Sequence, residues 1–202
     1  MKIEKDLIET KRLILKKAKV GDYKLLFENF WSDEKGWKYM LWRPIKNLTE
    51  AREKMKDFVE KQKGKPRFLI FEKKSDMPIG IASIITRDDG SVKDFAIGMG
   101  TKFTGQGYGY EISKALIDYS FELLQQDEIF TACMVEDKHT YGLQKKLGMT
   151  ERGISPKAYT RNWDGLAYNK VKFIMTREDW LKTKKKEKGI FKIFKKNRYN
   201  IA

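Results

Sequence analysis

Apolar side chains recur along this chain with two different spacings, and the changes between them mark the expected elements. Alternation at every second residue is typical of a half-buried strand, whereas spacings of three and four residues are typical of a helix face. The segments expected to form strands are residues 10–16, 67–73, 79–86, 92–99, 129–135, 149–159 and 166–175. The segments with helical spacing are residues 22–30, 47–62, 108–125 and 140–147. This order predicts an α/β fold around a mixed sheet.

Residues that favour helix ends and turns support several of these boundaries. Asn47 can cap the second helix, and Gly64 with Pro66 would end it. Gly90 belongs to a hairpin signal between two strands, and Gly148 follows the last short helix, where glycine is common. Because no Gly/Ser-rich linker and no internal repeat divides the chain, we expect one domain.

Composition limits the class of protein. Of the 202 residues, 41% are hydrophobic and 13% are aromatic, which is enough to fill one core and too many for a chain that is disordered throughout. One cysteine and one histidine cannot build a disulfide framework or a structural zinc site, so no metal is expected. A run of about eighteen apolar residues and a secretory leader are both missing from the sequence, which predicts a soluble, cytoplasmic protein.

Positive charge is concentrated at the C-terminal end. The formal net charge is +15, and residues 182–202 carry +8 of it, since they contain nine Lys or Arg and one Glu. We therefore divide the chain into a domain of residues 1–181 and a basic tail of residues 182–202. Gly189 is expected to interrupt any helix that continues from the domain into the tail. The apolar residues of the tail are Ile190, Phe191, Ile193, Phe194, Tyr199 and Ile201. The tail is either a solvated terminus or a contact for an anionic surface, RNA or a membrane.

A glycine-rich stretch separates the strand expected at residues 92–99 from the helix that follows it. Its sequence is Gly105-Gln106-Gly107-Tyr108-Gly109. Glycines let an anion approach the backbone closely, and a helix N-terminus offers free N–H groups and the positive end of the helix dipole. The spacing matches neither the dinucleotide-binding pattern nor the Walker pattern, which requires a Lys where this chain has Gln106. The stretch is therefore either a phosphate-binding turn of another kind or a glycine-rich turn without a ligand.

Four segments taken together resemble a known family. Thr104–Gly109 resembles motif A of the GCN5-related N-acetyltransferases, and Asp137–Met149 resembles their motif B. Thr10–Leu15 and Asp164–Trp180 resemble the opening and closing segments of the ribosomal-protein N-terminal acetyltransferase branch. Because the four segments occur in order at appropriate distances, the resemblance spans about residues 8–181.

The resemblance implies a fold and a cofactor. The fold is a mixed, mostly antiparallel central sheet of about seven strands with four helices, splayed at the cofactor site. The cofactor is acetyl-CoA, used as a co-substrate, and no metal is implied. The implied contacts are the backbone of Ile97 and Met99, the loop residues Thr104, Gly105, Gln106, Gly107, Tyr108 and Gly109, and the motif B residues Asp137 and Thr140. Thr104 replaces the family's usual Gln or Arg, and Asp137 replaces an Asn, which removes an amide donor.

The sequence indicates the general acid and the general base of acetyl transfer less clearly than the cofactor site. Many family members have a catalytic Tyr where this chain has Gln144, which cannot deliver a proton. Thr140 is the first candidate for stabilising the departing thiolate, with helix capping as its alternative, and Tyr141 is the second. Glu111 is the leading candidate for the base, although a carboxylate in the first turn of a helix also complements the helix dipole.

Two further features of the sequence indicate how the amine attacks the thioester and where the acceptor binds. Cys133 lies mid-strand among apolar residues, where an inert thiol is expected, so the amine should attack directly in a ternary complex. Trp37, Tyr39 and Trp42 belong to an aromatic cluster between the first two helices, which we interpret as a wall of the acceptor site. The expected acceptor is a primary amine, either a protein N-terminus or a small molecule.

Two other functions compete with an N-acetyltransferase. A catalytically silent acyl-CoA-binding module would explain the departures at Thr104, Asp137 and Gln144. A nucleic-acid-binding or ribosome-associated protein would explain the net charge, but that charge lies mainly in the tail and the domain carries no nucleic-acid motif. Both a monomer and a homodimer are compatible with the sequence.

Overall fold

Nine strands form a single sheet in the part of the chain that the structure describes. The computed structural model describes the backbone of residues 1–198 and the side chains of residues 1–187. The strands are β1 (Lys2–Glu4), β2 (Leu7–Glu9), β3 (Leu13–Lys16), β4 (Arg67–Glu72), β5 (Met77–Thr86), β6 (Val92–Met99), β7 (Glu128–Met134), β8 (Thr150–Thr160) and β9 (Ala167–Thr176). Their order in the sheet is β1-β2-β3-β4-β5-β6-β7-β9-β8, and only the β6–β7 pair is parallel.

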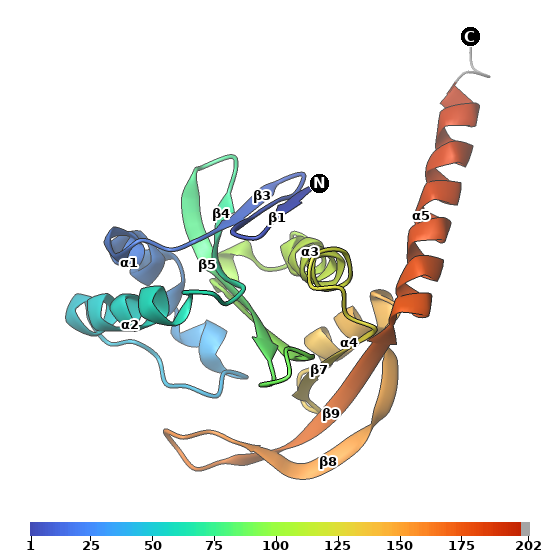
Figure 1. Cartoon of the computed structure of the whole chain (residues 1–202). Helices are drawn as coiled ribbons and strands as arrows, with labels where there is room; N and C mark the ends of the chain where they lie inside the picture. The colour runs from blue at the N-terminus through green and yellow to red at the C-terminus, as the bar shows by residue number, and fades with distance from the viewer. Residues whose placement is uncertain (199–202) are drawn as a thin grey trace.

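Helices cover both faces of this sheet (Figure 1). They are α1 (Tyr23–Leu26), α2 (Leu48–Lys61), α3 (Tyr108–Glu122), α4 (Lys138–Lys146) and α5 (Arg177–Arg198). Side chains alternate across β4, as the pleat requires. Phe68 and Ile70 join the core that contains α3, whereas Leu69 and Phe71 join a second core with α1 and α2. The sheet is therefore buried on both faces near its centre.

The sheet splits between β6 and β7. Strand β6 pairs with β5 over its whole length, and β7 pairs over its whole length with β9. The two central strands pair with each other only at Val92 and Ile129, near the start of each strand. From there they diverge, so the second half of β6 has a free edge toward β7. The splay that the family resemblance implied is therefore present.

Most expected elements form within a few residues of the expected bounds, but the N-terminal region differs. The expected seven strands and four helices become nine strands and five α-helices within residues 1–198. The added strands are β1 and β2, which form a hairpin ahead of β3, and the added helix is α5. Their three-residue length leaves too few positions for a clear period. The helix expected at residues 22–30 is one α-turn followed by a wider π-helical turn, Phe27–Trp31, which buries Phe30 and Trp31.

The C-terminal helix also differs from the prediction. Helix α5 runs without a break through Gly189, because one glycine costs only about 1 kcal/mol in a helix whose other residues favour the helical state. Its first turns lie against α3: Trp180 stacks on Phe121, and Lys184 forms an ion pair of 2.9 Å with Asp118. The helix then extends away from the domain (Figure 1). The apolar side chains expected at positions 190–201 lie outside the described side chains. Within residues 1–198, no helix is long and apolar enough to cross a membrane.

Candidate active site

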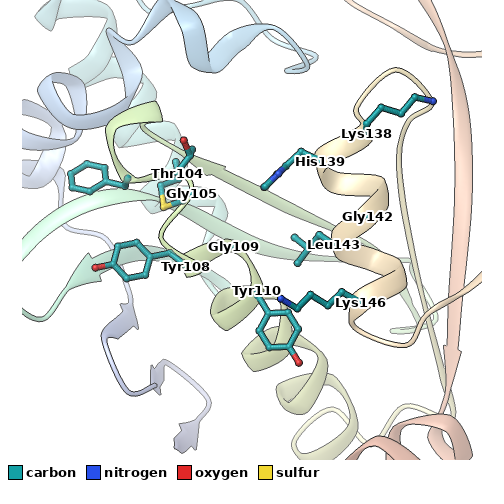
Figure 2. A pocket seen from close by; sticks show the side chains of 13 residues that line it. Thr104, Gly105, Tyr108, Gly109, Tyr110, Lys138, His139, Gly142, Leu143 and Lys146 are labelled. Atoms are coloured by element: carbon teal, nitrogen blue, oxygen red, sulfur yellow. The ribbon is translucent and has the colours of Figure 1, made fainter.

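Two adjoining cavities lie where the sheet splits. The first, which we call the loop cavity, has a volume of about 420 Å³ and lies between the start of α3 and helix α4 (Figure 2). The second, the cleft cavity, has a volume of about 500 Å³ and lies between β6 and β7. Met99, Thr104, Gly109, His139 and Leu143 line both, so the two cavities share a wall.

The glycine-rich loop forms one wall of the loop cavity. Gly105 and Gly107 have φ values of 74° and 80°, in the left-handed region that favours glycine. Gly107 is the N-cap of α3, and the first helical hydrogen bond runs from the Glu111 N–H to the Gly107 carbonyl at 3.2 Å. The preceding N–H groups have no partner within the helix and lie at its positive end. This arrangement fits a phosphate group.

Helix α4 supplies the opposite wall of the loop cavity. Figure 2 shows His139, Leu143 and Lys146 projecting from α4 toward the start of α3. Lys138 and Lys146 both line the cavity; Lys146 directs its ammonium toward the start of α3, whereas Lys138 directs its own away from it (Figure 2). Lys102, which precedes the glycine-rich loop, donates to the Asn29 amide oxygen at 2.7 Å. The cationic side chains of this cavity therefore come from α4.

The free edge of β6 presents backbone groups to the cleft cavity. The Gly100 N–H donates to the Ile79 carbonyl, so this residue directs its backbone toward β5. Because backbone groups alternate in direction along a strand, Ile97 and Met99 direct theirs the other way, toward β7. Strand β7 has already diverged at this point. The N–H and C=O groups of Ile97 and Met99 are thus available to an extended ligand.

Asp137 and Thr140 of motif B lie at the cleft cavity. The Asp137 carboxylate caps α4 by accepting a hydrogen bond of 3.0 Å from the Thr140 N–H. Thr140 therefore receives the cap rather than supplying it, and its side chain is not needed for capping. Both residues line the cleft cavity.

A carboxylate that the sequence analysis missed lies between the two diverging strands. Asp94, on β6, accepts hydrogen bonds from the Thr131 hydroxyl at 2.9 Å and from the Ala132 N–H at 3.1 Å, both on β7. Its second oxygen accepts from the Tyr159 hydroxyl at 3.3 Å. Burial raises the pKa of Asp94 despite these donors and the nearby Lys170 ammonium. A carboxyl group with a raised pKa on a cavity wall has the properties of a general base.

The neighbours of Asp94 stay protonated at neutral pH. Burial, together with the nearby carboxylates, raises the pKa of Cys133 to about 12. Burial and the charge of Asp94 likewise raise the pKa of Tyr159. Both side chains line the cleft cavity, so of these three groups Asp94 is the one suited to accept a proton near neutral pH.

Comparison with known proteins identifies the family. The family model described as "Acetyltransferase (GNAT) domain" matches residues 12–150, more than half of the chain. The chain belongs to the GNAT acetyltransferases. It is therefore an N-acetyltransferase that uses acetyl-CoA, the reactant that supplies the activated acetyl group as a thioester.

Individual relatives agree with this assignment. The chain is 28% identical over 168 residues to "Uncharacterized N-acetyltransferase YnaD" of Bacillus subtilis (strain 168), covering 80% of this chain and 94% of that protein. Its fold is shared with the ribosomal-protein-S5-alanine acetyltransferase of Vibrio fischeri (TM-score 0.69, 17% identity, 86% of this chain and 98% of that one). It is also shared with the spermidine N-acetyltransferase of Vibrio cholerae, solved with CoA and spermine (TM-score 0.68, 19% identity, 85% and 99%).

The structure places most of the expected cofactor residues of this GNAT domain around the two cavities. The exception in the loop is Gln106, whose side-chain amide donates to the Lys102 carbonyl at 3.3 Å and whose own carbonyl accepts from Arg12. Tyr108 contributes its backbone, since its ring is buried and its hydroxyl donates to Glu72 at 2.7 Å. Thr104 uses its hydroxyl to close its own turn, donating to the Thr101 carbonyl.

Glu111 is not positioned to act as the base. Its carboxylate accepts hydrogen bonds from the Thr10 hydroxyl at 2.7 Å, the Arg12 N–H at 2.8 Å and the Arg12 Nε at 2.7 Å. Burial opposes ionisation, but these donors together lower the pKa of Glu111. Glu111 lines neither cavity. A carboxylate that is saturated with donors and turned away from the cleft accepts protons poorly, so this prediction is corrected.

Tyr141 and Trp37 also lie outside both cavities. The Tyr141 hydroxyl donates to Glu151 at 2.6 Å, and its ring packs edge-on against Phe173 in the core. Trp37 is 2% exposed and stacks on Phe30, because large aromatic side chains in this segment fill the core beneath α2. The structure therefore gives both residues packing roles, in place of the catalytic role expected for Tyr141 and the acceptor contact expected for Trp37.

The other two aromatic residues of the expected acceptor wall do line the cleft cavity. Tyr39 donates to the Glu136 carbonyl at 3.1 Å, between β7 and α4. On the other side of this loop, the Arg161 guanidinium donates to the Lys38 carbonyl at 3.1 Å. The loop that carries Tyr39 and Trp42 is thus tied to both neighbouring segments, and it forms a fixed wall of the cleft cavity.

Proposed function

We propose that this chain acetylates a primary amine by direct attack within a ternary complex in the cleft between β6 and β7. The observation that carries the proposal is Asp94, a carboxylate with a raised pKa on the wall of the cavity that adjoins the phosphate-binding loop. As the amine nitrogen bonds to the acetyl carbon and the carbon–sulfur bond breaks, the amine proton passes to Asp94 and the thiolate takes up a proton from solvent. Asp94 then releases its proton to solvent, which restores the base.

The chain's own groups hold the acetyl donor in this proposal. The first-turn N–H groups of α3 bind the pyrophosphate, and Lys146 adds charge beside it. The free backbone edge at Ile97 and Met99 binds the extended pantetheine arm and donates to the thioester carbonyl as charge develops there. Cys133 remains a thiol because burial raises its pKa to about 12, which favours direct attack over an acyl-enzyme.

We place the acceptor amine beside Asp94 and against the wall formed by Tyr39 and Trp42. The resemblance of residues 10–15 and 164–180 to the ribosomal-protein branch, together with the fold shared with the S5-alanine acetyltransferase, favours a protein N-terminus. The fold shared with a spermidine acetyltransferase supports a small amine as the alternative. Both a monomer and a homodimer are compatible with this site, which is built from one chain.

Release of CoA tests the proposed function. We expect thiol release from acetyl-CoA that depends on an added amine, measured across peptides with different N-termini, amino acids and polyamines. The full chain is used, with a thermal shift on CoA addition as the measure of binding. Cofactor binding without turnover on every amine would instead support the catalytically silent acyl-CoA-binding module.

Thr140 is expected to support the departing thiolate. Since Asp137 already caps α4, Thr140→Ala should leave the helix intact while lowering kcat by roughly tenfold or more, with little change in CoA affinity. The measurement is steady-state kinetics beside calorimetric CoA binding. Thr49→Ala, in the first turn of α2, is the matched control and should keep wild-type values. Wild-type kcat in Thr140→Ala would remove this role.

The end of the basic tail is expected to bind polyanions independently of catalysis. Residues up to Glu187 belong to the fold, because Lys184 pairs with Asp118 and Glu187 pairs with Lys114 at 3.1 Å. Deleting residues 188–202 removes five positive charges, each worth about 1 kcal/mol near an anionic surface at low salt.

The truncated chain should therefore bind CoA normally but bind RNA or anionic vesicles more weakly. Both partners are measured by fluorescence anisotropy or co-sedimentation at two salt concentrations. The partner whose binding the deletion weakens identifies the surface. Loss of CoA binding with unchanged polyanion binding would mean that the tail acts only as structure.

A further inference from the structure

Arg12 contacts the glycine-rich loop that is proposed to bind the phosphates. It stands between β2 and β3, far from the loop in sequence, yet its Nη1 donates to the Gln106 carbonyl at 2.7 Å. A Cβ atom on Gly107 would lie 3.5 Å from its Nη2, so the guanidinium also touches the next residue of the loop. In the sequence, this arginine belongs to the opening segment that resembles the family, and no local pattern indicates a role for it in the site.

The contact with Gln106 fixes the direction of the neighbouring N–H group. In a trans peptide, the carbonyl of one residue and the N–H of the next point in opposite directions, and the described chain contains no cis peptide. A cation that holds the Gln106 carbonyl on one side of the loop therefore turns the Gly107 N–H to the other side. That side is the loop cavity, which Gly107 lines. The same cation polarises the peptide, which makes this N–H a stronger donor.

Glu111 holds Arg12 in this position. Its carboxylate accepts from both the backbone N–H and the Nε of Arg12 and from the hydroxyl of Thr10. Thr10 is 7% exposed, and its oxygen in turn accepts from the Leu13 N–H at 3.0 Å. The ion pair is thus anchored at the start of β3, and it leaves Nη1 to bind the loop.

The ring of Tyr108 holds the guanidinium from another direction. The Arg12 Cζ lies 4.4 Å from the centre of this ring, and the Tyr108 hydroxyl donates to Glu72 on β4 at 2.7 Å. The Arg12 side chain thus packs on the first turn of α3, and Tyr108 links this turn to strand β4. This geometry requires the planar, forked guanidinium, since an ammonium cannot make the same set of contacts.

We propose that Arg12 is a positioning residue for acetyl-CoA: held by Glu111 and Tyr108, it orients the Gly107 N–H toward the pyrophosphate without touching the cofactor. The proposal rests on the proposed cofactor site. In this arrangement, Glu111 acts through Arg12 rather than as a base. The loop is preorganised before the cofactor arrives, which reduces the ordering cost of binding.

The test compares Arg12→Lys and Arg12→Gln with wild type, and Arg52→Gln on the exposed side of α2 is the control. We expect the KM for acetyl-CoA and the calorimetric Kd for CoA to rise roughly tenfold in Arg12→Gln, with kcat nearly unchanged, since one charge-directed hydrogen bond is weakened. Arg12→Lys should recover only part of this loss. Glu111→Gln should show a smaller rise, because it loosens the arginine without removing it.

Shortened cofactors distinguish this positioning role from a direct contact with the 3′-phosphate and from general structural support. CoA and dephospho-CoA should lose affinity equally in Arg12→Gln, whereas turnover of S-acetyl-pantetheine, which has no pyrophosphate, should be unchanged. A loss confined to CoA would overturn the proposal in favour of direct contact with the 3′-phosphate. An equal loss with S-acetyl-pantetheine, or a fall in kcat alone, would reduce Arg12 to general structural support. Failure of the wild-type chain to bind CoA would contradict the proposed function itself.

Discussion

Replacing Gly107 by valine should abolish measurable CoA binding. Gly107 caps α3 with φ at 80°, a conformation that a β-branched residue adopts only at a cost of about 1–3 kcal/mol. The loop can relieve this strain by rotating the peptides on either side of residue 107. That rotation withdraws N–H groups from the phosphate, and the loss of two hydrogen bonds to a charged group weakens binding by roughly 100-fold or more. Calorimetry and the CoA-induced thermal shift measure the effect.

Gly64 provides a matched control for this substitution. It also has a positive φ, 65°, and has open space around its Cβ position, but it follows α2. Gly64→Val should therefore carry a similar backbone strain and lower the thermal stability without changing CoA affinity. If Gly107→Val kept the wild-type thermal shift with CoA, the phosphate would have to bind elsewhere.

Replacing Asp94 by asparagine should lower kcat/KM by roughly 100-fold or more, the usual contribution of a general base. Asparagine has nearly the same shape, and its oxygen can still accept from Thr131 and the Ala132 N–H, so the strands should remain in place. The affinity for CoA should be unchanged. Asp89→Asn, in the β5–β6 turn, is the matched control and should behave as wild type.

The pH dependence gives Asp94 a second test. A base must be ionised to accept a proton, so wild-type kcat/KM should fall as the pH drops through the raised pKa of Asp94. In Asp94→Asn this acidic limb should disappear or move to the titration of another group. An unchanged pH profile at full activity would exclude Asp94 as the base, and a parallel loss of CoA affinity and thermal stability would show a structural role only.

The arrangement of elements was largely predictable because local signals agree with the tertiary structure. Helix α2 begins at the expected cap, where Asn47 accepts from the Glu50 N–H at 2.9 Å, and β4, β5 and β7 carry buried apolar runs. The β1–β2 hairpin is too short to have a period. Helix α5 continues through Gly189, and its first turns are held against α3 by Trp180 and Lys184. No local sequence pattern indicates these contacts with α3.

The parts of the site that are formed by backbone groups were predictable from the sequence. The parts that depend on contacts between side chains of distant elements were not. The glycine loop and the free edge of β6 follow from local sequence and the family resemblance. Asp94 was missed because an acid within a strand gives no local sign of the neighbouring strand that buries it. Glu111 was misassigned because its partners, Thr10 and Arg12, are about one hundred positions away. The sequence could not distinguish the core residue Trp37 from the cavity-lining residues Tyr39 and Trp42, since only their burial in the fold shows which role each has.

A crystal structure of the full chain with CoA and a peptide amine tests the central claim most directly. The account predicts the pyrophosphate on the N–H groups of residues 107–109, the pantetheine arm along Ile97 and Met99, and the amine nitrogen within hydrogen-bond reach of Asp94, directly or through one water. A sulfur outside the β6–β7 cleft, or an amine nitrogen facing another carboxylate, would contradict it.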